Sequence, residues 1–85
     1  MFIHITYVKY LHHYCLELAF NTGDSGKVDL SHRLHGEMFS PLRDVMLFAT
    51  ATLDPIGKTV TWVNGADLAP EYLFKLLKEQ HRSPV

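Results

Sequence analysis

Residues 57–71 read GKTVTWVNGADLAPE, and they predict a strand, a tight turn and the start of a helix. Residues 59–63 are mostly β-branched or aromatic, which suits a pleated and half-buried surface. The Asn-Gly pair at 64–65 tolerates the positive φ angles of a sharp turn. Asp67 and Pro70 then stand at the spacing of a helix start, and an apolar run follows them. The stretch therefore predicts a change from strand to helix within a few residues.

The N-terminal part of the chain predicts three strands. Residues 3–8 are rich in β-branched and aromatic residues, and residues 14–20 alternate with a period of two, as a strand with one buried face does. After a loop at residues 21–26, residues 27–30 resume the alternation, so the last two runs are expected to form a hairpin. The side chains predicted to face the core are Tyr14, Leu16, Leu18, Phe20, Val28 and Leu30.

The middle of the chain predicts two helical segments. Residues 31–36 are expected to form one helical turn that Gly36 closes. Ser40 has the features of an N-cap and Pro41 those of a first helical residue, which together predict a helix through Phe48. The apolar positions at helical spacing in this second segment are Leu42, Val45, Met46 and Ala49.

The C-terminal half predicts a second hairpin and a final helix. Residues 50–53 and 59–63 are expected to pair across a turn at 54–57. The final helix is predicted over residues 70–80, with one stripe formed by Leu73, Leu76, Leu77 and Gln80 and widened by Phe74.

The predicted order of elements, β-β-β-α-β-β-α, defines an α+β fold. Its small, mostly antiparallel sheet is built from two hairpins, and its helices pack on one face of that sheet. With 85 residues, the chain is expected to form a single domain over residues 1–85.

Composition limits the classes of function. The formal net charge is −1, so the chain lacks the strongly basic balance that most nucleic-acid-binding domains show. Cys15 is the only cysteine, which fits a reducing compartment because no disulfide can form within the chain. The N-terminal residues lack the pattern of a signal peptide, and no apolar run approaches the length of a membrane helix. We therefore expect a cytoplasmic protein without membrane contact.

Histidine spacing raises the question of a metal site. His32 and His35 are three residues apart, so one helical turn would place them on the same side with Asp29 nearby. This set is kept as an alternative, in which the protein would be a small metal-dependent enzyme. His12 and His13 are predicted to point to opposite faces of a strand and so not to bind the same ion. Apart from that alternative, no metal, cofactor or catalytic residue is expected.

Basic residues cluster in the last turns of the final helix. Lys75, Lys78, His81 and Arg82 lie there, where the helix dipole favours positive charge. A nucleic-acid-associated accessory or regulatory domain is the first alternative function, and it would use Lys75, Lys78 and Arg82. Direct binding to nucleic acid is nevertheless not expected.

Several short segments in a fixed order cover most of the chain. The most specific block is residues 60–62, Val-Thr-Trp, followed by residues 64–71, NGADLAPE. The other segments are residues 16–20, Gly26, residues 28–31, Phe39, residues 41–44 and Phe48. In this order and spacing, the sequence resembles the domain of unknown function 2442 family. Ala69 stands where that pattern has a polar N-cap, so Asp67 is predicted to bond the first N–H groups of the final helix.

The resemblance implies a small bacterial α+β protein with no established activity. It also implies a role as the antitoxin partner of a small protein encoded by an adjacent gene. Some relatives carry a helix-turn-helix domain after this one, for which 85 residues leave no room.

Our leading hypothesis is a non-catalytic protein-interaction module, antitoxin-like and not an enzyme. A thin core and open sheet edges would gain from a small protein partner that covers them, and self-association is a further option. Trp62 is either a core anchor or the centre of an interface, where tryptophan is over-represented. The residues predicted to make the contact are Trp62, Asn64, Asp67, Phe39, Arg43 and Asp44.

Overall fold

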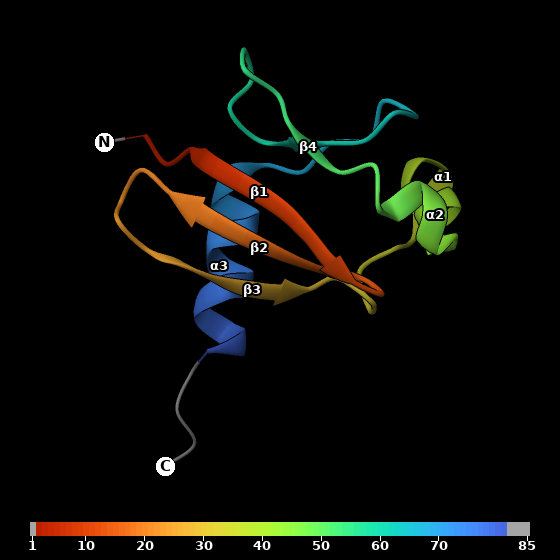
Figure 1. The fold of residues 1–85 in the computed structure, drawn as a ribbon, viewed down its shortest axis with the longest axis horizontal. Coiled ribbons are helices and arrows are strands. Elements are labelled where there is room, and N and C mark those ends of the chain that lie inside the picture. The colour runs from red at the N-terminus through yellow and green to blue at the C-terminus, as the bar shows by residue number, and fades with distance from the viewer. Residues whose placement is uncertain (1, 82–85) are drawn as a thin grey trace.

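A three-stranded antiparallel sheet and one long helix form the main body of the protein. This computed structural model describes residues 2–81. The strands β1 (Ile5–His12), β2 (Cys15–Phe20) and β3 (Ser25–Asp29) lie in the order β1-β2-β3, and the helix α3 (Pro70–Gln80) packs across one face of the sheet (Figure 1). The α+β class is confirmed.

The central strand, β2, follows the predicted alternation. Leu16, Leu18 and Phe20 are buried, and the residues between them are partly exposed. The first strand is longer than the predicted residues 3–8, because β1 stays paired with β2 as far as the His12–Cys15 pair. Residues 9–12 carried no strong alternation of their own, so only the pairing with β2 places them in the sheet.

The predicted helix over residues 40–48 is wrong, and so is the predicted turn of helix over 31–36. The segment instead consists of a short helix α1 (Gly36–Phe39), a 3₁₀ turn η1 (Ser40–Arg43) and a second short helix α2 (Val45–Phe48). Gly36 therefore begins a helix and does not close one, and Ser40 lies within the 3₁₀ turn. The break falls at Asp44, whose extended backbone (ψ 114°) interrupts the helix while its carboxylate accepts a hydrogen bond from the Met46 N–H.

The second hairpin forms a separate small sheet. The strands β4 (Thr52–Leu53) and β5 (Val60–Thr61) are shorter than predicted, and they pair with each other and not with β1, β2 or β3. The backbone N–H of Ile5 donates a hydrogen bond to the Lys58 carbonyl, which holds the second hairpin against β1. The short helices α1 and α2 lie at one end of the three-stranded sheet, where Phe48 of α2 packs against Tyr10 of β1, while α3 packs across the sheet (Figure 1).

Helix α3 has the predicted bounds, and its last turn protects the edge of the sheet. Leu73, Leu76 and Leu77 are buried as predicted. Gln80, predicted in the same stripe, is exposed, and its side-chain amide accepts from the Asp29 N–H (2.8 Å) and donates to the Asp29 carbonyl (2.9 Å). The two bonds occupy the Asp29 backbone groups as a neighbouring strand would, so Gln80 shields part of the outer edge of β3. None of the described helices is long and apolar enough to cross a bilayer.

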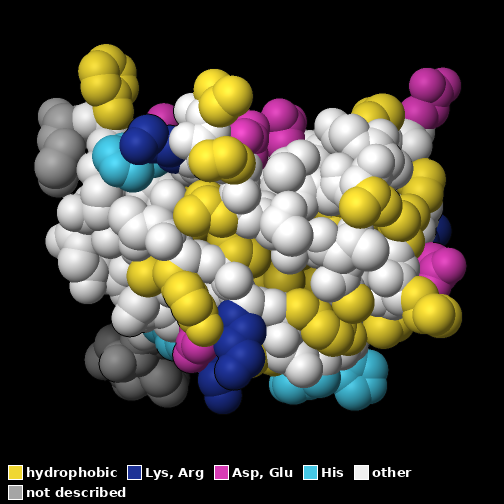
Figure 2. All heavy atoms as spheres, turned by 45° about the horizontal axis from the view of Figure 1, so that its top comes forward, with side chains coloured by type: hydrophobic (Ala, Val, Ile, Leu, Met, Phe, Trp, Pro, Cys, Tyr) yellow, Lys and Arg dark blue, Asp and Glu magenta, His cyan; other side chains and the backbone are white. Residues whose placement is uncertain are grey.

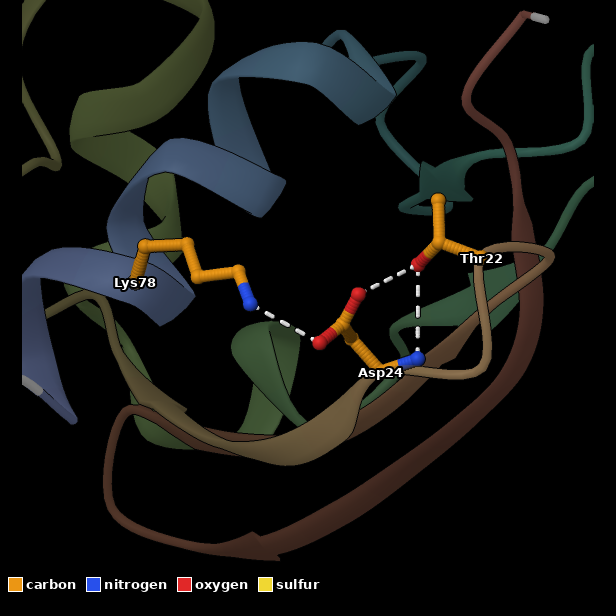
Figure 3. A network of polar contacts seen from close by, with 3 residues as sticks. All are labelled: Thr22, Asp24 and Lys78. Atoms are coloured by element: carbon orange, nitrogen blue, oxygen red, sulfur yellow. Dashed lines mark hydrogen bonds and ion pairs between the residues drawn. The ribbon is translucent and has the colours of Figure 1, made fainter.

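A polar clamp joins α3 to the loop before β3 (Figure 3). The ammonium of Lys78 lies 2.8 Å from one carboxylate oxygen of Asp24, and the Thr22 hydroxyl donates to the other at 2.7 Å. The Lys78 ammonium also lies 5.2 Å from the centre of the Phe74 ring, one helical turn earlier. The clamp fixes the C-terminal half of α3 over the sheet.

Acid is expected to weaken this clamp. The hydrogen bond from Lys78, and then that from Thr22, holds the pKa of Asp24 below its usual range. The unfolded chain has the ordinary pKa, so the stabilisation is complete above that value and disappears as the pH falls through the lowered, folded-state pKa. Urea unfolding midpoints, measured from neutral to strongly acidic pH, should therefore fall less steeply for Asp24→Asn than for the natural chain. Asp67→Asn, at an exposed position before α3, is the matched control and should keep the natural slope.

Candidate interaction surface

Trp62 lies in the core. Its side chain is 3% exposed, and its indole Nε1–H donates a hydrogen bond of 3.0 Å to the Phe48 carbonyl. The ring packs against Phe48, with centroids 5.7 Å apart, and against Phe39 at 6.4 Å. Of the two roles left open by the sequence, the structure places Trp62 in the core one. The indole packs beneath α1 and α2, so it is not itself accessible to a partner.

Asn64 ties the turn after β5 to α1. Its side-chain oxygen accepts from the Ala66 N–H, which closes the turn that the Asn-Gly pair predicted. Its side-chain nitrogen donates to the Met38 carbonyl, at 3.0 Å. Because it is only partly exposed and bonded on both sides, Asn64 orients neighbouring segments and has little surface of its own.

Asp67 does not cap the final helix, so that prediction is wrong. The N-cap of α3 is Ala69, and no side chain accepts a hydrogen bond there. Asp67 instead forms an isolated bridge with Thr61, which holds its backbone beside β5 and leaves its side chain exposed. The chain thus approaches α3 in an extended conformation, and Pro70 occupies the first turn without needing an N–H partner.

The other three predicted contact residues lie on the same end of the molecule. Phe39 is partly buried against Trp62. Arg43 is exposed, and its guanidinium donates to the Leu34 carbonyl (2.9 Å) and to His35 Nδ1 (3.3 Å). Asp44 caps α2, as described above. All three therefore shape the α1–α2 segment, and Arg43 and Asp44 also reach solvent.

Apolar side chains stand exposed on the same end of the protein, and sequence reasoning missed them. In Figure 2, hydrophobic side chains gather on the right-hand part of the face, over α1 and α2, with acidic groups at the margin. The bond from Asn64 to Met38 places the turn after β5 beside α1. We call the following set the α1–α2 apolar surface: Met38 (45% exposed), Val45 (38%), Met46 (83%) and Val63 (73%).

The predicted inward positions of Val45 and Met46 are therefore wrong. The break at Asp44 rotates α2 relative to the expected single helix, so Leu42 and Phe48 are buried and Val45 and Met46 face solvent. A period of 3.6 residues predicts which side chains share one face of a helix only where that helix is continuous. The aspartate before an apolar run was the signal that could have revealed the second N-cap.

The basic cluster on α3 is partly neutralised. Lys78 pairs with Asp24, while Lys75 is exposed on the same helix. His81 donates from Nε2 to the Lys27 carbonyl, at 2.6 Å, so it belongs to the edge of β3. Arg82 lies outside the described residues.

The proposed metal ligands Asp29, His32 and His35 do not form a site. Asp29 accepts from the Ser31 N–H, and His35 Nε2 donates to the His32 carbonyl. Within residues 2–81, no group of three or more His, Cys, Asp or Glu side chains could hold a metal ion. The predicted helical turn, which would have brought these side chains together, does not exist.

Cys15 lies on the face of β2 opposite Leu16 and Leu18, as the alternation predicts. Burial raises the pKa of its thiol, the nearby Asp29 carboxylate raises it further, and Lys27 opposes both. The thiol is therefore protonated at neutral pH, which gives it little nucleophilic character. No pocket opens among the residues that the structure describes.

These features define a small α+β domain in which one helix covers a three-stranded antiparallel sheet and two short helices present an apolar end. The sequence profile of the family described as "Protein of unknown function (DUF2442)" matches residues 5–79. The chain belongs to this family, which confirms the resemblance seen in the sequence. No curated protein and no solved structure matches the chain in the corresponding comparisons.

Proposed function

We propose that this protein is a non-catalytic protein-interaction module of the bacterial cytoplasm, the antitoxin-like partner of a small protein encoded by an adjacent gene. The observation that supports this function is the α1–α2 apolar surface, on which Met46 is 83% and Val63 73% exposed. Large apolar side chains exposed on neighbouring segments of a small domain are candidates for protein contacts. Methionine adapts to irregular partner surfaces because its side chain is unbranched and polarisable.

The support beneath the surface suits a binding site. Phe39, Phe48 and Trp62 form an aromatic layer under α1 and α2, and Asn64 fastens the neighbouring turn to α1. A surface held in this way loses little conformational freedom when a partner binds, which favours affinity.

The charges beside the surface indicate the chemistry of the partner. Glu37, Asp44 and Asp67 are exposed on the segments that surround it, and Arg43 is the exposed basic residue among them. Arg43 already donates to Leu34 and His35, so the margin presents mainly carboxylates. We therefore infer a partner that places apolar side chains on Met38, Val45, Met46 and Val63 and arranges lysine or arginine around them.

Met46→Asp is expected to weaken partner binding without unfolding the protein. The new carboxylate would be desolvated in the interface, which we expect to weaken binding by about tenfold or more. Met46 lies in the first turn of α2, where an acidic residue suits the helix dipole, so the stability of the free protein should change by no more than about 0.5 kcal/mol. The measurement is isothermal titration calorimetry with the purified product of the adjacent gene.

Ile56→Asp is the matched control. Ile56 is 90% exposed, but it lies in the turn between β4 and β5, away from α1 and α2 (Figure 1). This variant should bind the partner as the natural chain does. No complex with the adjacent gene's product, or a complex that Met46→Asp leaves unchanged, would contradict the proposal, and co-purifying nucleic acid would favour the accessory-domain alternative instead.

A further inference from the structure

The tip of the β1–β2 hairpin brings two histidine side chains together. His12 ends β1 and His13 lies in the turn, and their Nδ1 atoms are 3.1 Å apart. The two rings stand nearly perpendicular, at 83°, with centroids 5.3 Å apart. The prediction that these side chains point to opposite faces is therefore wrong.

The backbone explains the close approach. His13 has a φ angle of 48°, in the left-handed region that a glycine or asparagine usually occupies in a tight hairpin. This conformation ends the alternation of the strand, and the pairing with β2 also shifts register between Tyr10 and His12. Both imidazoles consequently lie on the same side of the tip. Unusual backbone conformations of this kind are concentrated at functional sites.

Two imidazole nitrogens at this distance avoid repulsion between their lone pairs by sharing a proton or a metal ion. Without a metal, one Nδ1 must carry a proton that the other accepts. A divalent transition metal bound by both nitrogens can replace this hydrogen bond, lying off the line that joins them, because imidazole nitrogen is a preferred ligand of Zn²⁺, Ni²⁺ and Cu²⁺. With metal–nitrogen bonds of about 2.0–2.1 Å, neighbouring ligands are about 2.8–3.4 Å apart in square or tetrahedral geometry. The observed separation of 3.1 Å lies within this range.

We propose that His12 and His13 form a two-ligand site for a divalent transition-metal ion at the tip of the β1–β2 hairpin. Both residues are exposed, so the remaining coordination positions are open to water or to another donor. The site lies at the same end of the molecule as α1 and α2 (Figure 1), and a hydrogen bond from the Tyr14 hydroxyl to the Arg43 carbonyl joins the hairpin to η1. Because the probe is the metal ion alone, its binding is measured independently of any protein partner.

Calorimetric titration of the full chain with Ni²⁺, and separately with Zn²⁺, at neutral pH tests the site. We expect one ion per chain. His12→Ala and His13→Asn should each weaken binding by about tenfold or more, since the loss of a direct ligand costs at least as much as the loss of a residue that supports one. Asparagine at position 13 retains the left-handed turn. His32→Ala, which removes an exposed histidine elsewhere, is the control and should bind as the natural chain does.

Nitrogen NMR of the natural chain gives a second readout that needs no variant. Titration with diamagnetic Zn²⁺ should shift the Nδ1 resonances of His12 and His13 and leave those of the other histidines in place. The proposal is overturned if neither ion binds at millimolar concentration, if binding survives both substitutions, or if the shifted resonances belong to other histidines.

Discussion

Trp62→Ala is expected to destabilise the domain by about 3–5 kcal/mol, the usual cost of removing a large buried aromatic side chain. The indole is 3% exposed and fills the space between Phe48 and Phe39. The substitution would also leave the Phe48 carbonyl without its hydrogen bond from Nε1. A small domain is typically stable by only about 5–15 kcal/mol, so much of the folded population could be lost.

Urea unfolding followed by far-ultraviolet circular dichroism measures this effect, since the substitution removes the only tryptophan fluorophore. Trp62→Phe keeps an aromatic ring but not the donor, so it should lose less than Trp62→Ala. Val63→Ala, at the neighbouring exposed position, is the matched control and should change the stability by no more than about 0.5 kcal/mol. A loss below about 1 kcal/mol for Trp62→Ala would show that the aromatic layer is not a packed core.

Gly26→Ala is the second substitution with a large expected effect, at about 1–3 kcal/mol of destabilisation. A Cβ atom at this position would lie 2.8 Å from Leu77 Cδ1 and 3.2 Å from His81 Nε2. Leu77 is buried in the core, and His81 donates to the Lys27 carbonyl, so neither side chain is free to withdraw without cost. The glycine therefore allows α3 to approach β3 closely. The measurement is again the free energy of unfolding in urea.

A double-mutant cycle isolates this contact. Leu77→Ala removes the Cδ1 atom that obstructs the new methyl group, so Gly26→Ala should cost much less in that background than in the natural chain. Ser25→Ala, at the exposed position before Gly26, is the control for changes in the backbone of β3. Additive costs in the cycle would be inconsistent with a clash between residue 26 and Leu77.

Local patterns were sufficient for the elements whose geometry is continuous. The alternation around Leu16 and Leu18 predicted the central strand, and the spacing of Leu73, Leu76 and Leu77 predicted α3 with its observed bounds. The Asn-Gly pair predicted the turn that Asn64 closes. In each case, the structure of the segment is set by residues that are close together in the sequence. Those residues therefore contain the information that is needed to predict it.

Prediction failed where one residue changes the direction of the chain. Asp44 interrupts the expected helix, which turns Val45 and Met46 outward and creates the apolar end proposed to bind a partner. His13 takes a left-handed conformation, which brings its Nδ1 atom to that of His12. The aspartate at position 44 was a local signal for the break, but the position of His13 relative to His12 depends on how the hairpin pairs with the rest of the sheet.

The sequence alone determined the α+β class, the family, the central strand and the final helix. The tertiary structure decided that Trp62 is buried, that Asp67 does not cap α3, and that Val45 and Met46 are exposed. The physical reason is that hydrophobic periodicity and turn preference act between residues a few positions apart. Burial depends instead on which distant segment covers a side chain, as Phe48 and Phe39 cover Trp62.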